Sequence, residues 1–544
     1  MAQRMGGMPL IVLSEESQRT SGRDAQSMNI TAGQAVAEAV RTTLGPKGMD
    51  KMLVDSGGDV IVTNDGVTIL KDMDIDHPAA NMIVDVAETQ EDEVADGTTT
   101  AVVITGELLK RAEDLLDQDI HATTLTQGFR QAAAEVESIL EENAIEVSTD
   151  DEEILLDIAG TAMTGKGAEG AKEILARLVV DAVTAIADDD GINLDHIKIR
   201  TDTGASINES ELIDGVIVGK GRVNQNMPTL VEDAKIALIE SALEFEDTEV
   251  SAEVNVTDPT QLEELVEKEK SIMREQVETI AEAGADVVLV KGAIMDYAQH
   301  HLAQHGILAV RRVTQGDLRK VARATGATLV HDISSLTEDD LGYAGRVEER
   351  VMDDEEQIIV EEVEDGKAVS LYLRGGTEHV VDEVERAVID SMGVVKVTLE
   401  DGLVLPGGGA PETELAMRLR DFAEGVGGRE QLAVEAFADS LEVIPRTLAE
   451  NAGHDPIDSL VELRSTHDDG QFAAGLDAYT GRVVDMTEEG VFEPLRVKTQ
   501  AIESATDAAV MILRIDDVIA AGDLRAERDE DDPTGETPSP AGGF

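Results

Sequence analysis

Hydrophobic residues recur at helical spacing in two stretches near the start of the chain. The first stretch, residues 31–44, places four apolar side chains on one stripe: Val36, Ala37, Val40 and Leu44. This spacing predicts a helix, which the Gly45-Pro46 pair stops because proline cannot continue a helix. A second helix is predicted to follow Asp96-Gly97 and to run through the apolar residues 101–104 to Leu116.

The central part of the chain alternates strand and helix patterns. Elements are short over residues 150–215, whereas 216–367 shows the pattern of an α/β region. In that region the buried-strand runs Asp286–Val290 and Ile307–Val310 flank a helical stretch, Ala293–His305. After residue 403 the pattern is mainly helical, and from residue 527 the composition predicts a disordered tail.

A long charged helix is predicted to begin near Asp258. Asp258 suits the N-cap and Pro259 the first turn, while Gln261 nearly completes a capping box. The helix carries an apolar stripe made of Leu262, Leu265, Val266, Ile272, Met273 and Ile280. Such a stripe fits packing on the helix's own domain as well as contact with a partner, and periodicity alone leaves both open.

Composition limits the class of protein. A chain of 544 residues is long enough for two or three domains, and with 42% hydrophobic but only 2% aromatic residues its cores must be aliphatic. Asp and Glu outnumber Lys and Arg 113 to 44, giving a formal net charge of −69. This charge repels nucleic acid and anionic membranes. Molar salt shortens the Debye length to about 3 Å, so we expect a folded, salt-adapted protein.

The lack of cysteine and of long apolar segments limits the cellular compartment of the protein. The sequence contains no cysteine, which excludes disulfides and thiolate metal sites. The short apolar stretch at Leu10–Leu13 is too small for the core of a signal peptide, and no segment reaches the roughly 18 apolar residues of a membrane span. We therefore expect a soluble cytoplasmic protein.

Familiar nucleotide and metal motifs are incomplete. Residues 160–167 resemble a Walker A loop but end in Gly167, where a magnesium-binding Ser or Thr is required. The run Gly407-Gly408-Gly409 lacks the dinucleotide-binding spacing. His300, His301 and His305 include an i,i+4 pair, but without a nearby third ligand a solvated helix face is favoured over a zinc site.

Four other segments suggest phosphate chemistry when they are taken together. Residues 43–48 form a tight turn with exposed amides, and Asn64-Asp65-Gly66 is a turn that presents one carboxylate. Residues 96–100 place a carboxylate and three hydroxyls at a helix N-terminus, which favours a phosphate and a hard cation beside it. Asp390 is predicted in the last turn of a helix over Glu378–Met392, where the dipole disfavours a carboxylate. Singly, each segment is more typical of surface charge, a turn or a capped helix.

In this order the segments resemble the group II chaperonin family, which includes archaeal thermosomes and the eukaryotic cytosolic chaperonin. The resemblance covers essentially the whole chain and rests on residues 43–52 (TLGPKGMDKM), 63–70 (TNDGVTIL), 96–102 (DGTTTAV), 373–378 (LRGGTE) and 406–412 (PGGGAPE). Ala95 departs from the family pattern, which usually has glycine before Asp96, and this puts the local turn geometry in question.

The resemblance implies a multidomain α+β fold. Residues 1–149 and 403–526 would form a mainly helical equatorial ATP-binding domain, and 150–215 with 368–402 an intermediate hinge domain. Residues 216–367 would form an α/β apical domain for substrate binding, with a lid protrusion at about 250–282. Independently, candidate site residues on both sides of the middle region require that region to be an insertion.

The resemblance also implies a role for individual residues. Asp65 and Asp390 would position and activate the attacking water, and Asp96 would bind Mg²⁺. Phosphates of ATP would be held by Thr43, Leu44, Gly45, Pro46, Gly97, Thr98, Thr99 and Thr100. Lys166 would reach the γ-phosphate and report hydrolysis to the lid. The nucleoside pocket would be lined by Gly408, Asp477, Ala478 and Glu493.

The implied function is ATP-dependent protein folding. The chain would assemble with like subunits, identical or paralogous, into a double ring of eight subunits per ring that encloses non-native proteins. Two alternatives differ in class. A passive holdase would not hydrolyse ATP, and a small-molecule phosphotransferase would be a compact monomer or dimer.

Overall fold

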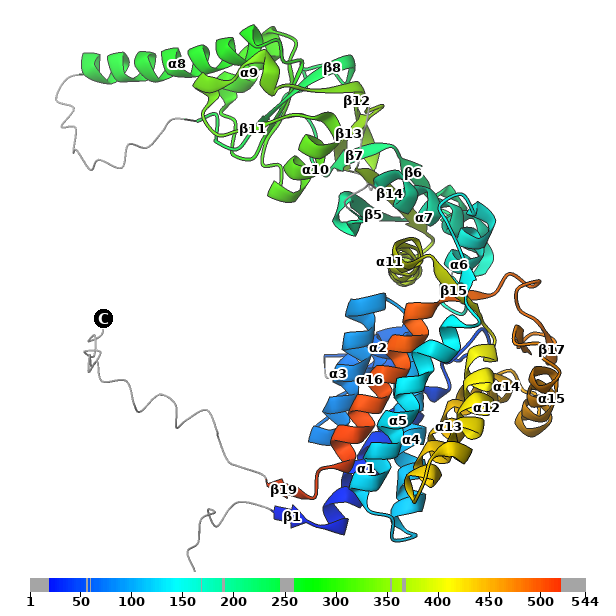
Figure 1. Ribbon diagram of the computed structural model, residues 1–544. Helices are drawn as coiled ribbons and strands as arrows, with labels where there is room; N and C mark the ends of the chain where they lie inside the picture. Colours follow the sequence, from blue (N-terminus) through cyan, green and yellow to red (C-terminus); the bar gives the residue numbers. More distant parts are fainter. Residues whose placement is uncertain are drawn as a thin grey trace, which may run out of the picture.

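The computed structural model describes residues 19–519, except 55–56, 59, 168, 188–190, 245–258, 353–354 and 364–367. The chain forms three bodies that follow one another along a curved, elongated molecule (Figure 1). A helical body lies at one end and a sheet-based body at the other. The body between them connects the two and is crossed by the chain in both directions.

The helical body combines helices from both ends of the described chain. Those from the first part are α1 (Arg23–Arg41), α2 (Gly66–Asp72), α3 (Pro78–Val94), α4 (Thr98–Leu116) and α5 (Ala122–Glu141). Those from the last part are α12 (Ala410–Gly425), α13 (Glu430–Leu441), α14 (Val443–Asn451), α15 (Pro456–Asp468) and α16 (Leu495–Leu513). Helix α4 is central, because it packs against α1, α3, α13 and α16.

Short strands complete this body. The strands β1 (Arg19–Ser21) and β19 (Asp517–Ile519) pair with each other, so the two ends of the described chain meet. Two antiparallel hairpins are formed by β2 (Lys51–Val54) with β3 (Val60–Thr63), and by β16 (Ala474–Asp477) with β17 (Arg482–Asp485). The strands β18 (Phe492–Pro494), β15 (Leu403–Pro406) and β4 (Ile145–Glu146) form a three-stranded sheet in that order.

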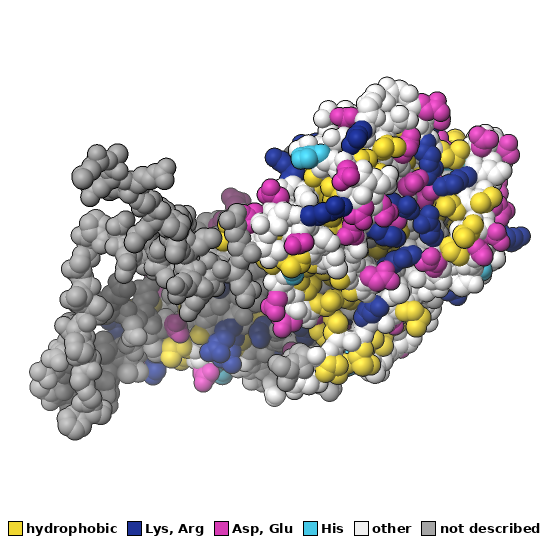
Figure 2. Space-filling view, turned by 90° about the horizontal axis from the view of Figure 1, so that it is seen from below, with side chains coloured by type: hydrophobic (Ala, Val, Ile, Leu, Met, Phe, Trp, Pro, Cys, Tyr) yellow, Lys and Arg dark blue, Asp and Glu magenta, His cyan; other side chains and the backbone are white. Residues whose placement is uncertain are grey.

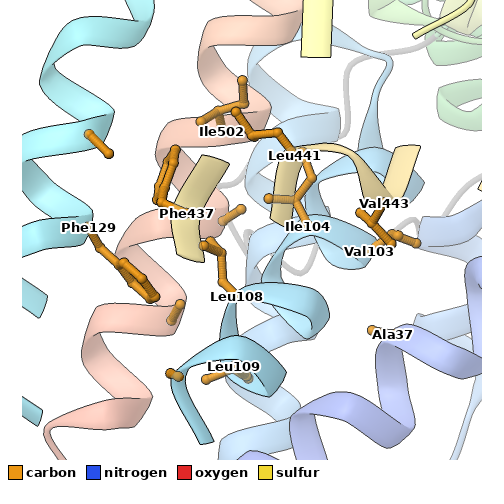
Figure 3. Close-up of a cluster of buried hydrophobic side chains, with 14 of the residues drawn as sticks. Ala37, Val103, Ile104, Leu108, Leu109, Phe129, Phe437, Leu441, Val443 and Ile502 are labelled. Atoms are coloured by element: carbon orange, nitrogen blue, oxygen red, sulfur yellow. The ribbon is translucent and has the colours of Figure 1, made fainter. Parts of the chain in front are cut away.

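The core of the helical body is largely aliphatic, as the low aromatic content predicts. Residues such as Ile104, Leu108 and Leu441 are fully buried between α4 and α13 (Figure 3). Phe129 and Phe437 meet edge to face, with ring centroids 5.8 Å apart. Burial of each such side chain contributes on the order of 2 kcal/mol, so this core joins the two ends of the chain tightly.

The middle body packs α6 (Glu152–Met163), α7 (Lys172–Ile186) and α11 (Glu378–Asp401) around a small sheet. The sheet has the order β5 (Ile197–Thr203), β14 (Val369–Gly375), β6 (Glu211–Ile213), with β5 and β14 parallel. Short 3₁₀ turns occur at Glu169–Ala171, Leu194–His196 and Ile207–Glu209.

The predicted end of the helix over Glu378–Met392 is wrong. Helix α11 continues to Asp401, because Val394, Val395 and Val397 keep one side of it buried. Asp390 therefore lies in the middle of a helix, and the argument from the helix dipole at its end does not apply.

The third body is an α/β unit built on a seven-stranded sheet. The order is β10 (Leu308–Val310), β9 (Val287–Val290), β8 (Leu230–Ile239), β12 (Gly342–Met352), β13 (Glu355–Glu361), β7 (Gly215–Val218), with β11 (Leu329–Val330) also on β8. Helices α8 (Pro259–Glu282), α9 (Asp296–Gln304) and α10 (Gln315–Thr325) accompany it, with 3₁₀ turns at Ile333–Ser335 and Glu338–Asp340. The predicted strand, helix and strand over 286–310 are confirmed as β9, α9 and β10.

Helix α8 confirms the predicted long charged helix, and its first part extends away from the sheet (Figure 1). The residues of its apolar stripe differ in burial. Met273 and Ile280 are buried in the core of the third body, whereas Ile272 is 50% exposed. The last part of α8 thus packs on its own body. Asp258 and the side chains of residues 259–266 lie outside the described residues.

The first predicted helix is also longer than expected. Helix α1 begins at Arg23, because the buried residues Ala25 and Ile30 continue its apolar stripe. It ends at Arg41, and Leu44 lies in the turn that leads to Gly45, whose φ is 82°. The second helix is confirmed as α4, with both ends as predicted. The tail predicted from residue 527 lies outside the described residues.

The surface is acidic but not uniformly so. Seen from below, one face carries Lys and Arg side chains interspersed with Asp, Glu and hydrophobic groups (Figure 2). Within the described ranges, no helix combines the length and the apolar character needed to cross a membrane.

Candidate functional site

A cavity of about 650 Å³ lies where the helical body meets the middle body, and residues of both bodies line it. Every site residue predicted from the sequence lines it: Thr43, Leu44, Gly45, Pro46, Asp65, Asp96, Gly97, Thr98, Thr99, Thr100, Lys166, Asp390, Gly408, Asp477, Ala478 and Glu493. These residues come from segments up to 450 positions apart in the sequence. The structure therefore brings all of them to one place.

The start of α4 forms one wall. Ala95 ends α3 in the left-handed conformation (φ 57°), and Gly97 repeats that conformation (φ 78°) immediately before Thr98. Gln90 fixes this turn, because its Nε2 donates to the carbonyl oxygens of Asp96 at 2.8 Å and Val497 at 3.1 Å. The first amides of α4 have no partner within the helix, which makes this end a favourable place for an anion.

The turn after α1 forms a second part of the same wall. Asn451 on α14 donates to the carbonyl oxygens of Arg41 and Leu44, at 3.1 and 2.9 Å, and so ties the turn to the other end of the chain. Glycine is required at position 48, because a Cβ there would lie 2.1 Å from the carbonyl oxygen of Thr43. The turn is therefore tied to α14, and it lines the same cavity as the start of α4.

Acidic side chains surround Lys166, one of the lysines that line the cavity. Lys166 Nζ lies 2.6 Å from Asp390 Oδ2 and 4.0 Å from Asp96 Oδ1. Burial alone would lower the pKa of Lys166, but the carboxylates of Asp390 and Asp96 raise it above its usual range. Burial raises the pKa of Asp390, although Lys166 opposes that shift. Asp65 caps α2, accepting from Thr68 N at 2.9 Å and Thr68 Oγ1 at 2.6 Å.

Sequence reasoning missed Glu91, which lines the cavity from α3. Burial, with the nearby carboxylates of Asp390 and Asp65, raises the pKa of Glu91 to about 8. No pattern in the sequence singles it out, since it is one of 113 acidic residues on the chain. Glu91 does lie close in sequence to the predicted site, one residue after Gln90 and six before Gly97, but this proximity alone does not distinguish it from its acidic neighbours.

The incomplete Walker motif is explained by its location. Residues Gly160–Met163 are the last turn of α6, so the glycine-rich loop follows a helix instead of leading into one. Its Lys166 nevertheless enters the cavity. Asn64 Nδ2 donates to the carbonyl oxygen of Gly165, which ties this loop to the helical body.

The other end of the cavity is lined by apolar side chains and a few polar groups. Ile444, Leu448, Leu476 and Met486 line it beside the predicted residues Gly408, Asp477, Ala478 and Glu493. Burial would raise the pKa of Asp477, but hydrogen bonds from Thr480 and the Tyr479 amide lower it. An apolar slot with a few placed polar groups is typical of a site for a nucleoside-sized ligand.

The acidic end suits a divalent cation. Asp65, Asp96, Asp390 and Glu91 lie around one ammonium group, that of Lys166, and burial together with the neighbouring carboxylates raises the pKa of Glu91. A hard cation prefers such oxygen ligands. Within the described residues no group of three or more His, Asp or Glu side chains is placed to hold a metal ion, so a cation here would depend on further ligands such as phosphate oxygens.

Comparison with known proteins places this geometry in a family. The model of the TCP-1/cpn60 chaperonin family matches residues 36–523. The chain belongs to this chaperonin family. The mixed helix and strand architecture confirms the predicted multidomain α+β chaperonin fold.

Relatives of this chaperonin include thermosome subunits of archaea. Thermosome subunit 1 of Haloferax volcanii is 67% identical over 98% of this chain and 96% of the relative. Thermosome subunit alpha of Halobacterium salinarum is 66% identical over 98% of this chain and 95% of the relative. Both are halophilic archaea, in keeping with the acidic composition. An open-state monomer of a group II chaperonin from Methanococcoides burtonii is 47% identical, with a TM-score of 0.58, covering 77% of this chain and all of that one.

Proposed function

We propose that this chaperonin subunit hydrolyses Mg-ATP in the cavity and uses the hydrolysis to enclose and fold non-native proteins. Membership of the chaperonin family supports an ATP-dependent chaperone. The observation that carries the location is the convergence of two anion-binding turns, a cluster of carboxylates and an apolar slot on one cavity.

The residues divide by their position along the cavity. The amides of Thr98–Thr100 and the turn Thr43–Pro46 would hold the phosphates, and Asp96 would bind Mg²⁺, which neutralises charge on the transferring phosphoryl group. The nucleoside pocket would be lined by Gly408, Asp477, Ala478 and Glu493.

Hydrolysis would then depend on Asp65 and Asp390, which position and activate the attacking water. Asp390 is engaged by Lys166 at 2.6 Å. Lys166 therefore has to exchange Asp390 for the γ-phosphate before Asp390 can accept a proton from water. This exchange is the proposed link between the bound nucleotide and the middle body.

We propose that the three bodies are the three domains that the family resemblance implies. The helical body would be the equatorial domain (1–149 and 403–526), the middle body the intermediate domain (150–215 and 368–402), and the third body the apical domain (216–367). The projecting first part of α8 would be the lid, within residues 250–282. Met273 and Ile280 are buried in the core of the third body, so these two side chains are not available for contacts between subunits or with a client.

An exposed apolar hairpin supports assembly with like subunits. On β2 and β3, Met52 and Val54 are 68% and 62% exposed, and Val60, Ile61 and Val62 are also exposed. Apolar strands with free edges are sites for pairing with another chain. We propose a double ring, with eight subunits per ring and identical or paralogous neighbours, acting in the cytoplasm.

The test is ATP hydrolysis by the purified particle in multimolar KCl, with and without Mg²⁺. We expect turnover that requires Mg²⁺ and falls when Asp65 is changed to Ala, while the size of the particle is unchanged. A particle that protects an unfolded client without hydrolysing ATP would contradict the proposal and favour a holdase. A monomer or dimer that hydrolyses ATP would contradict the ring.

A further inference from the structure

A run of basic residues in the third body reverses the charge balance of the chain. Residues 311–323 contain five basic side chains and one acidic one, whereas acids outnumber bases 113 to 44 over the whole sequence. The acidic member, Asp317, is already engaged, because Lys198 of the middle body forms an ion pair with it. The run therefore carries positive charge that its own acidic residue does not offset.

Four cations in and beside this run are exposed and unpaired. Among the residues that the structure describes, none of the four forms an ion pair. Other arginines of the third body are paired, such as Arg222 with Glu349 at 3.0 Å and Arg350 with Glu361 at 2.9 Å. The four therefore keep their N–H donors free for a partner outside the subunit. We call them the cationic edge: Lys291, Arg311, Arg312 and Arg319.

The fold gathers the cationic edge where two strands end. Strands β9 and β10 are parallel neighbours, and the amide of Arg312 donates to the carbonyl oxygen of Gly292 at 3.0 Å. Lys291, at the end of β9, therefore lies beside the residues that follow β10. Arg312 has a φ of 54°, in the left-handed region that side chains rarely occupy. Helix α10 begins three residues later, and its dipole adds positive charge at its start, one turn before Arg319.

The cationic edge lies on the side of the third body from which the first part of α8 projects. Only residues 283–286 separate the end of α8 from the start of β9, and the last part of α8 packs on the sheet. Helix α8 thus runs back along β9, and its first part extends beyond the end of that strand, where Lys291 lies (Figure 1). A surface beside the proposed lid faces the chains that the lid would enclose.

We propose that the cationic edge binds carboxylate-rich segments of non-native proteins. The inference rests on the proposed function and names the class of client segment that the third body selects. A net charge of −69 marks a salt-adapted protein. Other proteins dissolved in the same salt are expected to share this acidic composition, so their unfolded chains present clusters of Asp and Glu.

Arginine suits this task in concentrated salt. Molar salt shortens the Debye length to about 3 Å, so only groups in direct contact attract one another. A guanidinium makes two parallel hydrogen bonds to one carboxylate at contact distance, which an ammonium cannot do. Three of the four members of the cationic edge are arginines.

The experiment measures peptide binding to the assembled particle in multimolar KCl without nucleotide. Two fluorescein-labelled peptides share one length and one apolar framework, and one carries a run of Asp and Glu where the other carries Asn and Gln. Fluorescence anisotropy gives Kd for each, and the wild type should prefer the acidic peptide. Arg311→Gln combined with Arg319→Gln should lower that preference about fivefold, the contribution of two exposed contact pairs.

The matched control is Arg130→Gln combined with Arg514→Gln, which removes two exposed arginines of the helical body and should leave the preference unchanged. All four positions lie outside the cavity, so Mg-ATP hydrolysis should be unchanged in both double variants. If the test variant does not assemble, Arg319→Gln alone should lower the preference about twofold.

The inference would be overturned by a wild type that binds both peptides equally, or by an equal loss in the control variant. It would also be overturned if the test variant kept the peptide preference but lost the protection from protease that ATP confers on the third body, since the arginines would then serve contacts between subunits. Competition by a poly-U oligonucleotide for the peptide would assign the cationic edge to nucleic acid instead. Failure of the proposed function would look different, because the wild type would then bind neither peptide and hydrolyse no ATP.

Discussion

The raised pKa of Glu91 gives the protein a pH dependence that a single substitution should remove. Burial, together with Asp390 and Asp65, raises this pKa from 4.5 to about 8. The folded state then holds a proton that the unfolded chain releases. The stability that this proton represents is fully present below pH 4.5 and is lost as the pH rises to about 8. Above pH 8 both states are ionised and the loss is complete.

The size of the effect follows from that shift. Each pKa unit corresponds to about 1.4 kcal/mol, so Glu91 destabilises the empty subunit at pH 8 by at most about 5 kcal/mol. Glu91→Gln has nearly the same shape and no charge, so it should be more stable than wild type by a few kcal/mol at pH 8 and nearly equal to it at pH 4.5. With an unfolding entropy of about 1.1 kcal/mol per degree for a chain of this length, a few degrees in Tm are expected.

The assay is thermal unfolding in multimolar KCl between pH 4.5 and 9, without nucleotide or Mg²⁺. The matched control is Glu93→Gln, which removes an exposed carboxylate from the same helix and should follow the wild type at every pH. Mg²⁺ with ADP should narrow the difference in Tm between Glu91→Gln and wild type, because a cation beside Asp96 favours ionised Glu91. The reasoning would be refuted if the difference in Tm between Glu91→Gln and wild type did not widen between pH 4.5 and 8. It would also be refuted if Glu93→Gln had an equal effect.

Three further predictions use other parts of the molecule. Asp390→Ala should lower ATP turnover by on the order of 10²-fold while ATP still binds, as measured by steady-state hydrolysis and equilibrium binding, and unchanged turnover would contradict its role. Replacing residues 259–269 of α8 by a short Gly-Ser linker should leave ATPase activity and assembly but abolish encapsulation of a client, and refolding by that variant would contradict the lid. Extending the deletion to Ile280 should also unfold the third body, because Met273 and Ile280 are in its core. Dilution from multimolar to about 0.1 M salt lengthens the Debye length to about 10 Å, so repulsion between acidic subunits should dissociate the ring. Light scattering should show this dissociation together with loss of ATPase activity, and Mg-ATP should delay both. An intact, active particle at low salt would show that the acidic excess does not impose the salt requirement.

Local patterns predicted those elements whose signals lie in adjacent residues. Helix α4 begins and ends as the sequence indicated, because Gly97 starts it and its apolar run continues without a break. The predicted end of α11 at Met392 was wrong, and the next residue, Gly393, is of a type that disfavours the interior of a helix. In the fold it allows close approach of α3, since a Cβ at Gly393 would lie 2.3 Å from Cβ of Ala95. Tertiary contact, absent from the local pattern, explains that glycine.

The candidate site shows the same division. The turns at 43–48 and 96–100 were found because backbone geometry requires particular residue types there. Glu91 was missed because it matters only through partners that are distant in sequence, such as Asp390. On a chain with 113 acidic residues, a buried carboxylate cannot be told from a surface one without the fold.

The placement of Lys166 relates the charge of the site to the junction between two bodies. Lys166 and Asp390 both belong to the middle body, whereas Asp96 belongs to the helical body and lies 4.0 Å from the ammonium group. Attraction between Lys166 and Asp96 contributes to the contact between the two bodies, beside the packing of α6 and α11 against the helical body. If Asp96 binds a divalent cation as proposed, the cation would weaken that attraction, and a γ-phosphate would offer Lys166 a new partner. We infer that loss of the γ-phosphate would return Lys166 to Asp390, its partner within the middle body at 2.6 Å, so hydrolysis would remove a link between the bound nucleotide and the middle body.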